Sequence, residues 1–270
     1  MSLPIYKYTA MGNDMLVVDP AKWSRPFTPD MAQKLCDRHF GVGADGICYG
    51  PLPHANGHAM RFFNPDGSEA EKSGNGLRIM ARYLWDNDYT QSSPFTLVIS
   101  GDVITAHILD DTAVTISLNM GQLTILPPRQ LTINHPTQTY TLTLMPASIG
   151  NPHAIHFTDH LNTLHQLGDS IATHPTFPKG TNVQFVQILN RHAIRIEIWE
   201  RGAGYTMASG TSACAAAGTA VTLGYCLSPV TVHMAGGTAK VTIDETQHVT
   251  LIGTVFPVFS GVLAPDFFNP

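Results

Sequence analysis

The chain has 270 residues, of which 43% are hydrophobic, and its 15 basic and 20 acidic side chains give a formal net charge of −5. This length suits one large domain or two ordinary ones. Apolar residues recur along the whole chain, which excludes a disordered protein. The Lys and Arg residues form no cluster, so we expect no nucleic-acid partner, because neutralising phosphates requires a basic face.

Signals for membranes and secretion are missing from the sequence. No apolar run approaches the roughly 20 residues of a membrane span, and no charged-then-apolar leader opens the chain. The four cysteines have neither CxxC spacing nor the density of a disulfide scaffold. We therefore expect a soluble, cytoplasmic protein with no membrane partner.

The sequence predicts many short strands and few helices. Alternating segments rich in Val, Ile and Thr are separated by Gly, Asp, Asn or Pro, which is typical of antiparallel meanders. Two buried helices are predicted over 77–84 and 213–220, where apolar residues recur at i, i+3, i+4 and i+7. The predicted strands are 95–100, 103–109, 113–119, 140–144, 182–189, 193–199 and 249–255.

The two halves of the chain share a pattern of motifs. A strand and an acidic or glycine-bearing loop lead to a Ser-Gly turn in each half, and Ser209 lies 136 residues after Ser73. Several matches in the same order indicate an internal duplication. The matching segments are 12–14 with 150–152, 61–67 with 196–202, and 73–76 with 209–212.

The duplication predicts an α+β fold of two pseudo-symmetric lobes, whose two Ser-Gly helix starts face each other across a pseudo-twofold axis. We place the first lobe at 1–120 and the second at 121–257, since 121–128 is rich in Gly and Pro. A final strand at 258–270 can return to the first lobe.

The two Ser-Gly turns carry the clearest chemical signal. A helix N-terminus has N–H groups without acceptors and a partial positive charge, which together bind a carboxylate or phosphate. Ser73 and Ser209 occupy the expected N-cap positions. Serine is also simply a good cap, worth about 1 kcal/mol. Two such turns, each followed by glycine and preceded by a matching strand, favour the anion-binding interpretation.

Polar residues that follow predicted strands form a second candidate set. Asparagine is common in turns for local reasons, so each one alone has a structural explanation. An arginine is suited to bidentate carboxylate recognition, and the glutamate beside it is either its partner or an acceptor for a substrate ammonium. His153 lies beside one asparagine, where it can orient a catalytic group. The set comprises Asn64, Asn151, Asn182, Glu200 and Arg201.

We expect no cofactor and no metal. Residues 41–46 match the dinucleotide pattern GxGxxG, but a helix-like stretch precedes them and a strand-like segment follows, which reverses the order that this motif requires. The 13 histidines include no HExxH motif, and the His and Cys residues lack zinc-site spacing.

Together these motifs resemble those of diaminopimelate epimerase and its cofactor-independent amino-acid racemase relatives. The resemblance implies two αβ lobes, each a mostly antiparallel, barrel-like sheet around a central helix, with the active site in the cleft between them. It also implies a homodimer, an amino-acid substrate, no pyridoxal phosphate, and a role such as lysine biosynthesis. The motifs, in the family's order, are 11–14, 41–46, 63–69, 74–76, 150–153, 180–183 and 200–204.

The family inverts a Cα stereocentre by two-base chemistry, in which one cysteine thiolate removes the α-proton and a second cysteine protonates the opposite face. By resemblance, the α-carboxylate is held at both helix starts, and the α-ammonium by Glu200 and the Arg201 backbone. The resemblance implies that three asparagines and the Arg201 side chain bind the distal end of the substrate, with Asn13 nearby. The carboxylate residues are Gly74, Asn75, Gly210 and Thr211, and the asparagines are Asn64, Asn151 and Asn182.

The chain departs from the family at its two catalytic cysteines, which are Ser73 and Ser209 here. A thiol has a pKa of about 8.5, whereas a hydroxyl approaches the ~15.7 of water. A gap of up to about 7 pKa units corresponds to roughly 10 kcal/mol. His153 is the obvious candidate for an adjacent base. Cys214 lies too far along the second helix to substitute, and Tyr205 replaces a glutamate usual in the family.

Three explanations of this departure follow. The chain is an epimerase of LL- to meso-diaminopimelate whose two thiols were exchanged for serine, which is the interpretation we prefer. It is alternatively a natural paralogue that racemises or dehydrates another amino acid. The third explanation is a non-catalytic amino-acid-binding protein.

Overall fold

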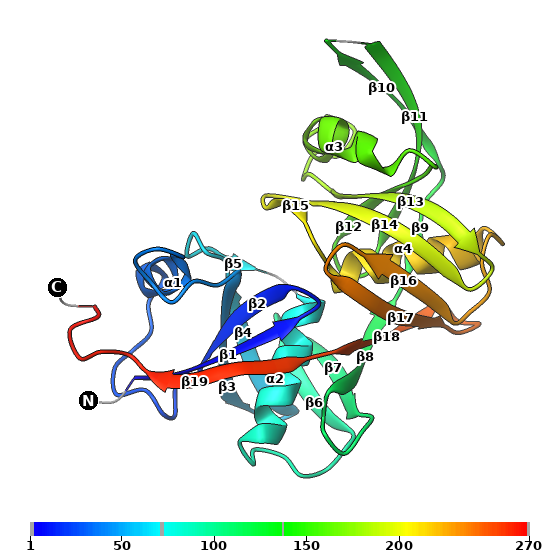
Figure 1. The fold of residues 1–270 in the computed structure, drawn as a ribbon. Coiled ribbons are helices and arrows are strands. Elements are labelled where there is room, and N and C mark those ends of the chain that lie inside the picture. Colours follow the sequence, from blue (N-terminus) through cyan, green and yellow to red (C-terminus); the bar gives the residue numbers. More distant parts are fainter. Residues whose placement is uncertain (1–2, 71–72, 137, 269–270) are drawn as a thin grey trace. The chain divides into compact units, whose positions relative to one another are not determined.

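The computed structural model describes residues 3–70, 73–136 and 138–268 (Figure 1). The chain forms two compact units. Unit 1 comprises Met1–Leu118 and Gly253–Pro270, and unit 2 comprises Asn119–Ile252. The sequence placed these divisions after residues 120 and 257, whereas the units divide after residues 118 and 252.

Unit 1 is built from strands around one long helix (Figure 1). The C-terminal strand pairs with the first strand in antiparallel fashion, so the two ends of the chain belong to the same unit. Its elements are β1 (Pro4–Ala10), β2 (Asn13–Val18), α1 (Pro29–Cys36), β3 (Gly46–His54), β4 (Gly57–Phe63), β5 (Glu69–Ala70), α2 (Gly74–Asp86), β6 (Phe95–Ile99), β7 (Asp102–Ile108), β8 (Thr115–Gln122) and β19 (Phe256–Val262).

Unit 2 contains a second long helix, α4. Its β10–β11 hairpin lies beside a shorter helix, α3 (Figure 1). Strands β8 and β18 span the two divisions between the units. The elements of unit 2 are β9 (Thr124–Ile125), β10 (Arg129–His135), β11 (Gln138–Ser148), β12 (Pro152–Phe157), η1 (Leu161–Thr163), α3 (Leu164–Ala172), β13 (Asn182–Asn190), β14 (Ala193–Glu200), β15 (Gly204–Thr206), α4 (Gly210–Thr222), β16 (Val230–Met234), β17 (Gly237–Ile243) and β18 (His248–Thr254).

The strand pairings of the two units repeat in the same order. In unit 1, β2 pairs with β3 and β4 with β6 in parallel, and the pairs β1–β2, β3–β4, β4–β5, β6–β7 and β7–β8 are antiparallel. Unit 2 repeats this order from β11 to β18. Helix α1 follows β2, and α3 follows the equivalent strand β12. Helix α2 follows β5, and α4 follows the equivalent strand β15. This repetition confirms the internal duplication, and β10 is an addition to the repeat.

Each unit buries its long helix on nearly all sides. In α2 the residues from Gly74 to Ala81 are all buried, and in α4 every residue from Gly210 to Ala220 is buried. The run of small side chains in α4 lets strands approach closely: a Cβ on Gly218 would lie 2.3 Å from a Leu123 methyl carbon. A Cβ on Gly76 would lie 2.0 Å from the Phe62 ring. The two helices predicted from apolar spacing are therefore confirmed as central helices.

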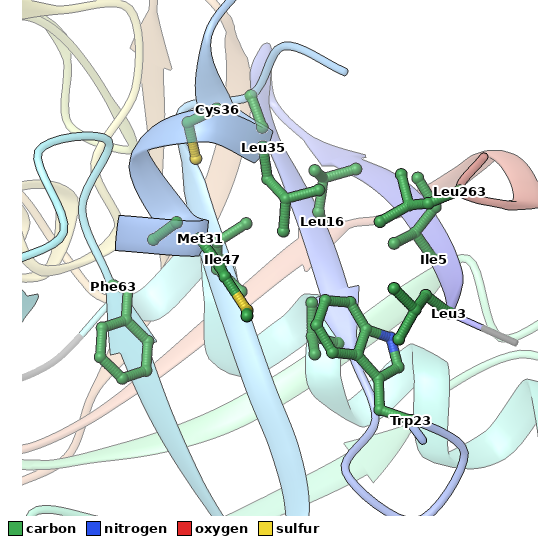
Figure 2. Packing of buried hydrophobic residues seen from close by; sticks show 13 residues of the cluster. Leu3, Ile5, Leu16, Trp23, Met31, Leu35, Cys36, Ile47, Phe63 and Leu263 are labelled. Atoms are coloured by element: carbon green, nitrogen blue, oxygen red, sulfur yellow. The ribbon is translucent and has the colours of Figure 1, made fainter. Parts of the chain in front are cut away.

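A second core cluster lies under α1 in unit 1 (Figure 2). Leu35 and Met31 of α1 point toward Leu16 and Ile47 on the strands below. Leu263, which follows the last strand, donates its backbone N–H to the Leu3 carbonyl and joins the same cluster. Burial of these side chains therefore fastens the C-terminal segment to unit 1.

The seven predicted strands are all present, with ends shifted by a few residues. The sequence prediction missed α3, although Leu164, Leu167 and Ile171 of that helix are fully buried in a cluster with side chains of β10, β11, β12 and β13. The helix is nine residues long and has no side-chain cap. Its packing on the strands of unit 2, rather than any end signal, stabilises it.

Leu35→Ala is expected to lower the free energy of unfolding by about 2–5 kcal/mol, because it leaves a cavity in a fully buried cluster. Leu109→Ala is the matched control, since that side chain is 50% exposed. We expect the control to change stability by less than about 0.5 kcal/mol. Urea unfolding followed by circular dichroism measures both, and equal effects would contradict the assignment of this core.

Candidate active site

The first candidate feature is the N-terminus of α2. Ser73 has extended backbone geometry, and its Oγ accepts a hydrogen bond of 3.1 Å from the Gly76 N–H. Its carbonyl accepts the Leu77 N–H at 2.9 Å. The described first turn of the helix contains no acidic residue, so no carboxylate of that turn offsets the positive end of the helix dipole. The predicted N-cap is confirmed.

The N-terminus of α4 in unit 2 has the same construction. Ser209 Oγ accepts the Ser212 N–H at 3.4 Å, and its carbonyl accepts the Ala213 N–H at 3.0 Å. No acidic residue lies in the first turn of this helix. Ser209 and Thr211 are 5% and 4% exposed. A dipole end surrounded by protein is screened less by water, so each helix start is suited to an anion.

In unit 1 the candidate asparagines lie at the strand ends near α2. Met15 is opposite Gly46, and Ile47 is opposite Phe63, so the starts of β2 and β3 and the end of β4 share one edge. Asn13 begins β2, and Asn64 follows β4. Asn64 Nδ2 donates to Ser68 Oγ at 2.9 Å within a turn. The contact of Gly76 with Phe62 brings the start of α2 to the same region.

Unit 2 repeats this arrangement with different side chains. His153 is opposite Asn182, and Val183 is opposite Trp199, so the starts of β12 and β13 and the end of β14 share one edge. Asn182 Oδ1 accepts the Arg201 N–H at 3.0 Å, and its Nδ2 donates to the Pro152 carbonyl at 2.9 Å. These bonds leave the Asn182 amide one further N–H and one lone pair.

A chain of hydrogen bonds links four candidate residues of unit 2. His153 Nε2 lies 2.9 Å from Asn151 Oδ1, Asn151 Nδ2 lies 3.4 Å from Thr211 Oγ1, and Thr211 Oγ1 lies 3.4 Å from Ser209 Oγ. The imidazole is 1% exposed. Burial lowers the pKa of His153 to about 3, a shift that the nearby Arg201 charge reinforces. The ring is therefore neutral near pH 7 and is a poor base, so its clearest effect is to orient Asn151.

Glu200 ends β14, and its carboxylate interacts with the Ser209 hydroxyl. Burial raises the pKa of Glu200, while a hydrogen bond from the Ser209 hydroxyl opposes that shift. Arg201, next in the chain, is exposed and donates from Nη1 to the Lys179 carbonyl at 3.0 Å. Glu200 is thus half-buried, whereas the Arg201 side chain is exposed.

The structure gathers the candidate residues into two groups, one in each unit. The unit 1 group is Asn13, Asn64, Ser73, Gly74 and Asn75, and the unit 2 group is Asn151, His153, Asn182, Glu200, Arg201, Ser209, Gly210 and Thr211.

The sequence prediction overlooked two supporting side chains. Asp45 Oδ2 accepts from Asn13 Nδ2 at 3.1 Å, and Gln184 Nε2 donates to Ser212 Oγ at 2.9 Å. Asp45 stands in the 41–46 stretch, which the structure places between α1 and β3, confirming that it is not a dinucleotide motif. Its spacing from Asn13 carries no local signal, since only the pairing of β2 with β3 brings them together.

Tyr205, the departure from the family noted in the sequence, is 37% exposed on β15. Its ring centroid lies 4.6 Å from that of His165. Burial and the neighbouring Glu197 raise the pKa of its phenol to about 12, so it is protonated near neutral pH.

Among the residues that the structure describes, no group of three or more His, Cys, Asp or Glu side chains is arranged to hold a metal ion. No helix in this part of the chain combines the length and apolarity needed to cross a membrane.

Comparison with known proteins adds to this geometry. The family model described as diaminopimelate epimerase matches residues 5–126 and 146–256. "Diaminopimelate epimerase 2" of Nostoc sp. (strain PCC 7120) is 40% identical over 278 residues, which cover 98% of this chain and 97% of that protein. "Diaminopimelate epimerase" of Pelotomaculum thermopropionicum is 38% identical over 273 residues, covering 94% and 96%.

Solved structures share the fold at low sequence identity. A phenazine biosynthesis protein of the PhzF family from Bacillus anthracis matches with a TM-score of 0.76 at 14% identity, covering 98% of this chain and 99% of that one. A hydroxyproline epimerase from Agrobacterium vitis, with bound trans-4-hydroxy-L-proline, matches with a TM-score of 0.72 at 15% identity, covering 98% and 93%. These likenesses support a sheet-dominated α/β fold with few helices.

The lowered pKa of His153 predicts a pH-dependent stability. Below pH 6.5 the unfolded chain protonates this ring, but the folded chain does so only near pH 3, so stability falls as the pH drops through that window. We expect a loss of about 2 kcal/mol between pH 7 and pH 5 from this group. Urea unfolding at several pH values measures the slope.

His153→Gln should remove this part of the slope, whereas the exposed His160→Gln should keep it. His58, whose pKa is also lowered by burial, contributes to the slope in every variant. The same slope in both histidine variants would show that His153 is not the neutral ring described above.

Proposed function

Because the chain belongs to the diaminopimelate epimerase family, we propose that it takes LL-diaminopimelate and directs Ser73 and Ser209 to opposite faces of one Cα. It is an isomerase of the epimerase and racemase type, independent of pyridoxal phosphate. The finer proposal is that the two serines leave it able to hold this substrate but nearly unable to convert it to the meso form.

The observation that carries this proposal is the pair of serine-capped helix starts at equivalent positions of the repeat. Each belongs to a buried helix of 13 residues with no acidic residue in its described first turn. Two such dipole ends suit one α-carboxylate, and their stabilisation increases as negative charge develops on it during removal of the α-proton. In the proposal, Gly74, Asn75, Gly210 and Thr211 hold that carboxylate.

Glu200 supports the assignment of the α-ammonium. It is a half-buried carboxylate whose pKa burial raises and interaction with the Ser209 hydroxyl lowers, so a cation beside it would favour its ionised form. The Arg201 backbone, tied to Asn182, lies next to it. We propose that Glu200 and this backbone receive the α-ammonium next to the reacting carbon.

We propose that residues at the strand edges described above bind the distal amino-acid head. Asn64, Asn151 and Asn182 supply amide groups, and the Arg201 guanidinium supplies a bidentate partner for a carboxylate. A short or apolar amino acid would leave these groups unpaired, which favours a substrate with a second polar head. We propose that Asn13 lies near this distal head.

The two hydroxyls limit the reaction. Removing an α-proton with an alkoxide requires a base about 7 pKa units harder to form than a thiolate, or roughly 10 kcal/mol. His153 does not compensate, because its lowered pKa makes it a weak proton acceptor. The absence of both thiols favours a second candidate function: an amino-acid-binding protein without turnover. The homodimer and cytoplasmic location expected from the family complete the proposal.

Ser73→Cys with Ser209→Cys is expected to restore α-hydrogen exchange. In D2O, mass spectrometry should detect deuterium incorporation into LL-diaminopimelate at least about a thousandfold faster than with the serine chain, since the thiols remove most of the ~10 kcal/mol deficit. Each single cysteine variant is a control that should exchange hydrogen but invert the centre slowly. A folded double variant without exchange would contradict the proposed reaction.

Arg201→Ala should weaken diaminopimelate binding by about 2 kcal/mol, or roughly 30-fold, because it removes a charge-assisted bond to the distal carboxylate. Arg129→Ala is a matched control. Like Arg201, Arg129 is exposed and donates from Nη1 to one carbonyl, that of Thr176 at 3.1 Å. Titration calorimetry on the serine chain measures both variants. Unchanged affinity in Arg201→Ala would contradict the distal assignment.

A further inference from the structure

Asp45 fastens the start of β2 to the loop that precedes β3. Its Oδ2 accepts the side-chain Nδ2 of Asn13 at 3.1 Å and the backbone N–H of Asp14 at 3.2 Å. Its own N–H donates to the Asp14 carbonyl at 2.7 Å. Three hydrogen bonds therefore hold Asn13 and Asp45 in one fixed relation within unit 1.

Two cations hold this carboxylate and its neighbour in place. Arg38 Nη2 lies 2.6 Å from Asp45 Oδ1 and 2.7 Å from Asp14 Oδ1. Lys7 Nζ lies 2.6 Å from Asp14 Oδ2 and donates to the Gly43 carbonyl at 2.7 Å. Although burial opposes ionisation, hydrogen bonds from Arg38 and Lys7 lower the pKa of Asp14. With Arg38 on its other oxygen, Asp45 is left as a hydrogen-bond acceptor only.

This chemistry decides which way the Asn13 amide points. An acceptor-only carboxylate accepts a hydrogen bond from the NH2 group of the amide and would repel its oxygen. The Nδ2 end of Asn13 therefore faces Asp45, and the Oδ1 end faces away from it. An amide oxygen held in this way accepts hydrogen bonds from an ammonium, but it cannot donate a hydrogen bond to a carboxylate.

The three other asparagines assigned to the distal end of the substrate have different partners. Asn151 bonds a histidine nitrogen and a threonine hydroxyl, and Asn182 bonds two backbone groups. Asn64 bonds the hydroxyl of Ser68. A hydroxyl both donates and accepts, so it fixes an amide less firmly than a carboxylate does. Asn13 is thus the asparagine of this set whose orientation is set by an acidic side chain.

We propose that Asp45 is a positioning residue that turns the Asn13 amide so that its Oδ1 recognises the distal ammonium of the substrate. This inference rests on the proposed function, because it assumes a ligand with two amino-acid heads. Asp45 itself does not contact the ligand. Its role is to make the asparagine selective for a donor.

Two ligands isolate the distal ammonium. LL-diaminopimelate carries it, whereas L-2-aminopimelate has the same seven-carbon chain and distal carboxylate with hydrogen in its place. Titration calorimetry of the full serine chain with both ligands gives the ratio of their affinities. This ratio is the readout, because partial unfolding of a variant lowers both affinities by the same factor.

Asp45→Asn should weaken diaminopimelate binding about tenfold, and leave L-2-aminopimelate within about twofold, because an amide at position 45 lets Asn13 turn either way. Asn13→Ser should lose the same selectivity, and the double variant should lose nothing more. Asp86→Asn is the control: it breaks an aspartate–arginine pair of 2.7 Å in the same unit, at the far end of α2. The control should keep the preference of the unaltered chain.

Each other outcome overturns the inference. Equal weakening of both ligands by Asp45→Asn would make Asp45 a structural residue only, and no change in either affinity would show that Asn13 is not held by it. If the unaltered chain binds both ligands equally well, the distal ammonium is not recognised, while the proposed substrate class survives. If the unaltered chain binds neither ligand, the proposed function fails as well.

Discussion

The chemistry proposed for this protein depends on how each unit begins its central helix. A serine hydroxyl accepts a first-turn N–H, which lets a helix start inside the protein without an acidic side chain in the described part of its first turn. A carboxylate cap would satisfy the same N–H groups but would cancel the positive end of the dipole. Neutral serine caps therefore stabilise each helix and preserve an anion-binding end, which is the property that the proposed site requires.

The duplication supplies a serine-capped helix start in each unit, but the side chains around it differ between the two units. The asparagine that begins β2 is held by an aspartate, whereas the asparagine before β12 is held by a neutral histidine and a threonine. Under the first helix lies the thiol of Cys48, and at the equivalent strand position Gln184 bonds the first turn of α4. A substrate with two identical heads, of which only one is inverted, needs such a division, because identical half-sites would treat both heads alike.

Burial also disfavours charge on two candidate side chains of unit 2. The buried His153 is neutral, and Glu200 is a carboxylate whose burial disfavours ionisation until a cation arrives. These groups are suited to receiving an amino acid, since the ligand brings the charges that they lack. They are not suited to activating a hydroxyl, which would need a strong base next to each serine. The difference between binding and turnover in this chain follows from that contrast.

The amino-acid sequence determined the features that depend on neighbours in the chain. The caps at Ser73 and Ser209 and the strands of the repeat follow from local geometry and from alternation over a few residues. The family motifs are short stretches at the ends of these elements and in the turns between them, so they too were visible. The helix α3 was missed because its stability comes from packing on strands of unit 2 rather than from its own ends.

Only the tertiary structure decided how the polar side chains are held. Asn13 and Asp45 are 32 residues apart, and His153 and Thr211 are joined only through Asn151. The orientation of an amide and the charge of a histidine depend on the atoms that surround them. Strand pairing supplies those atoms from distant parts of the chain. For that physical reason the sequence indicated which residues could bind, and the fold determined what each one presents.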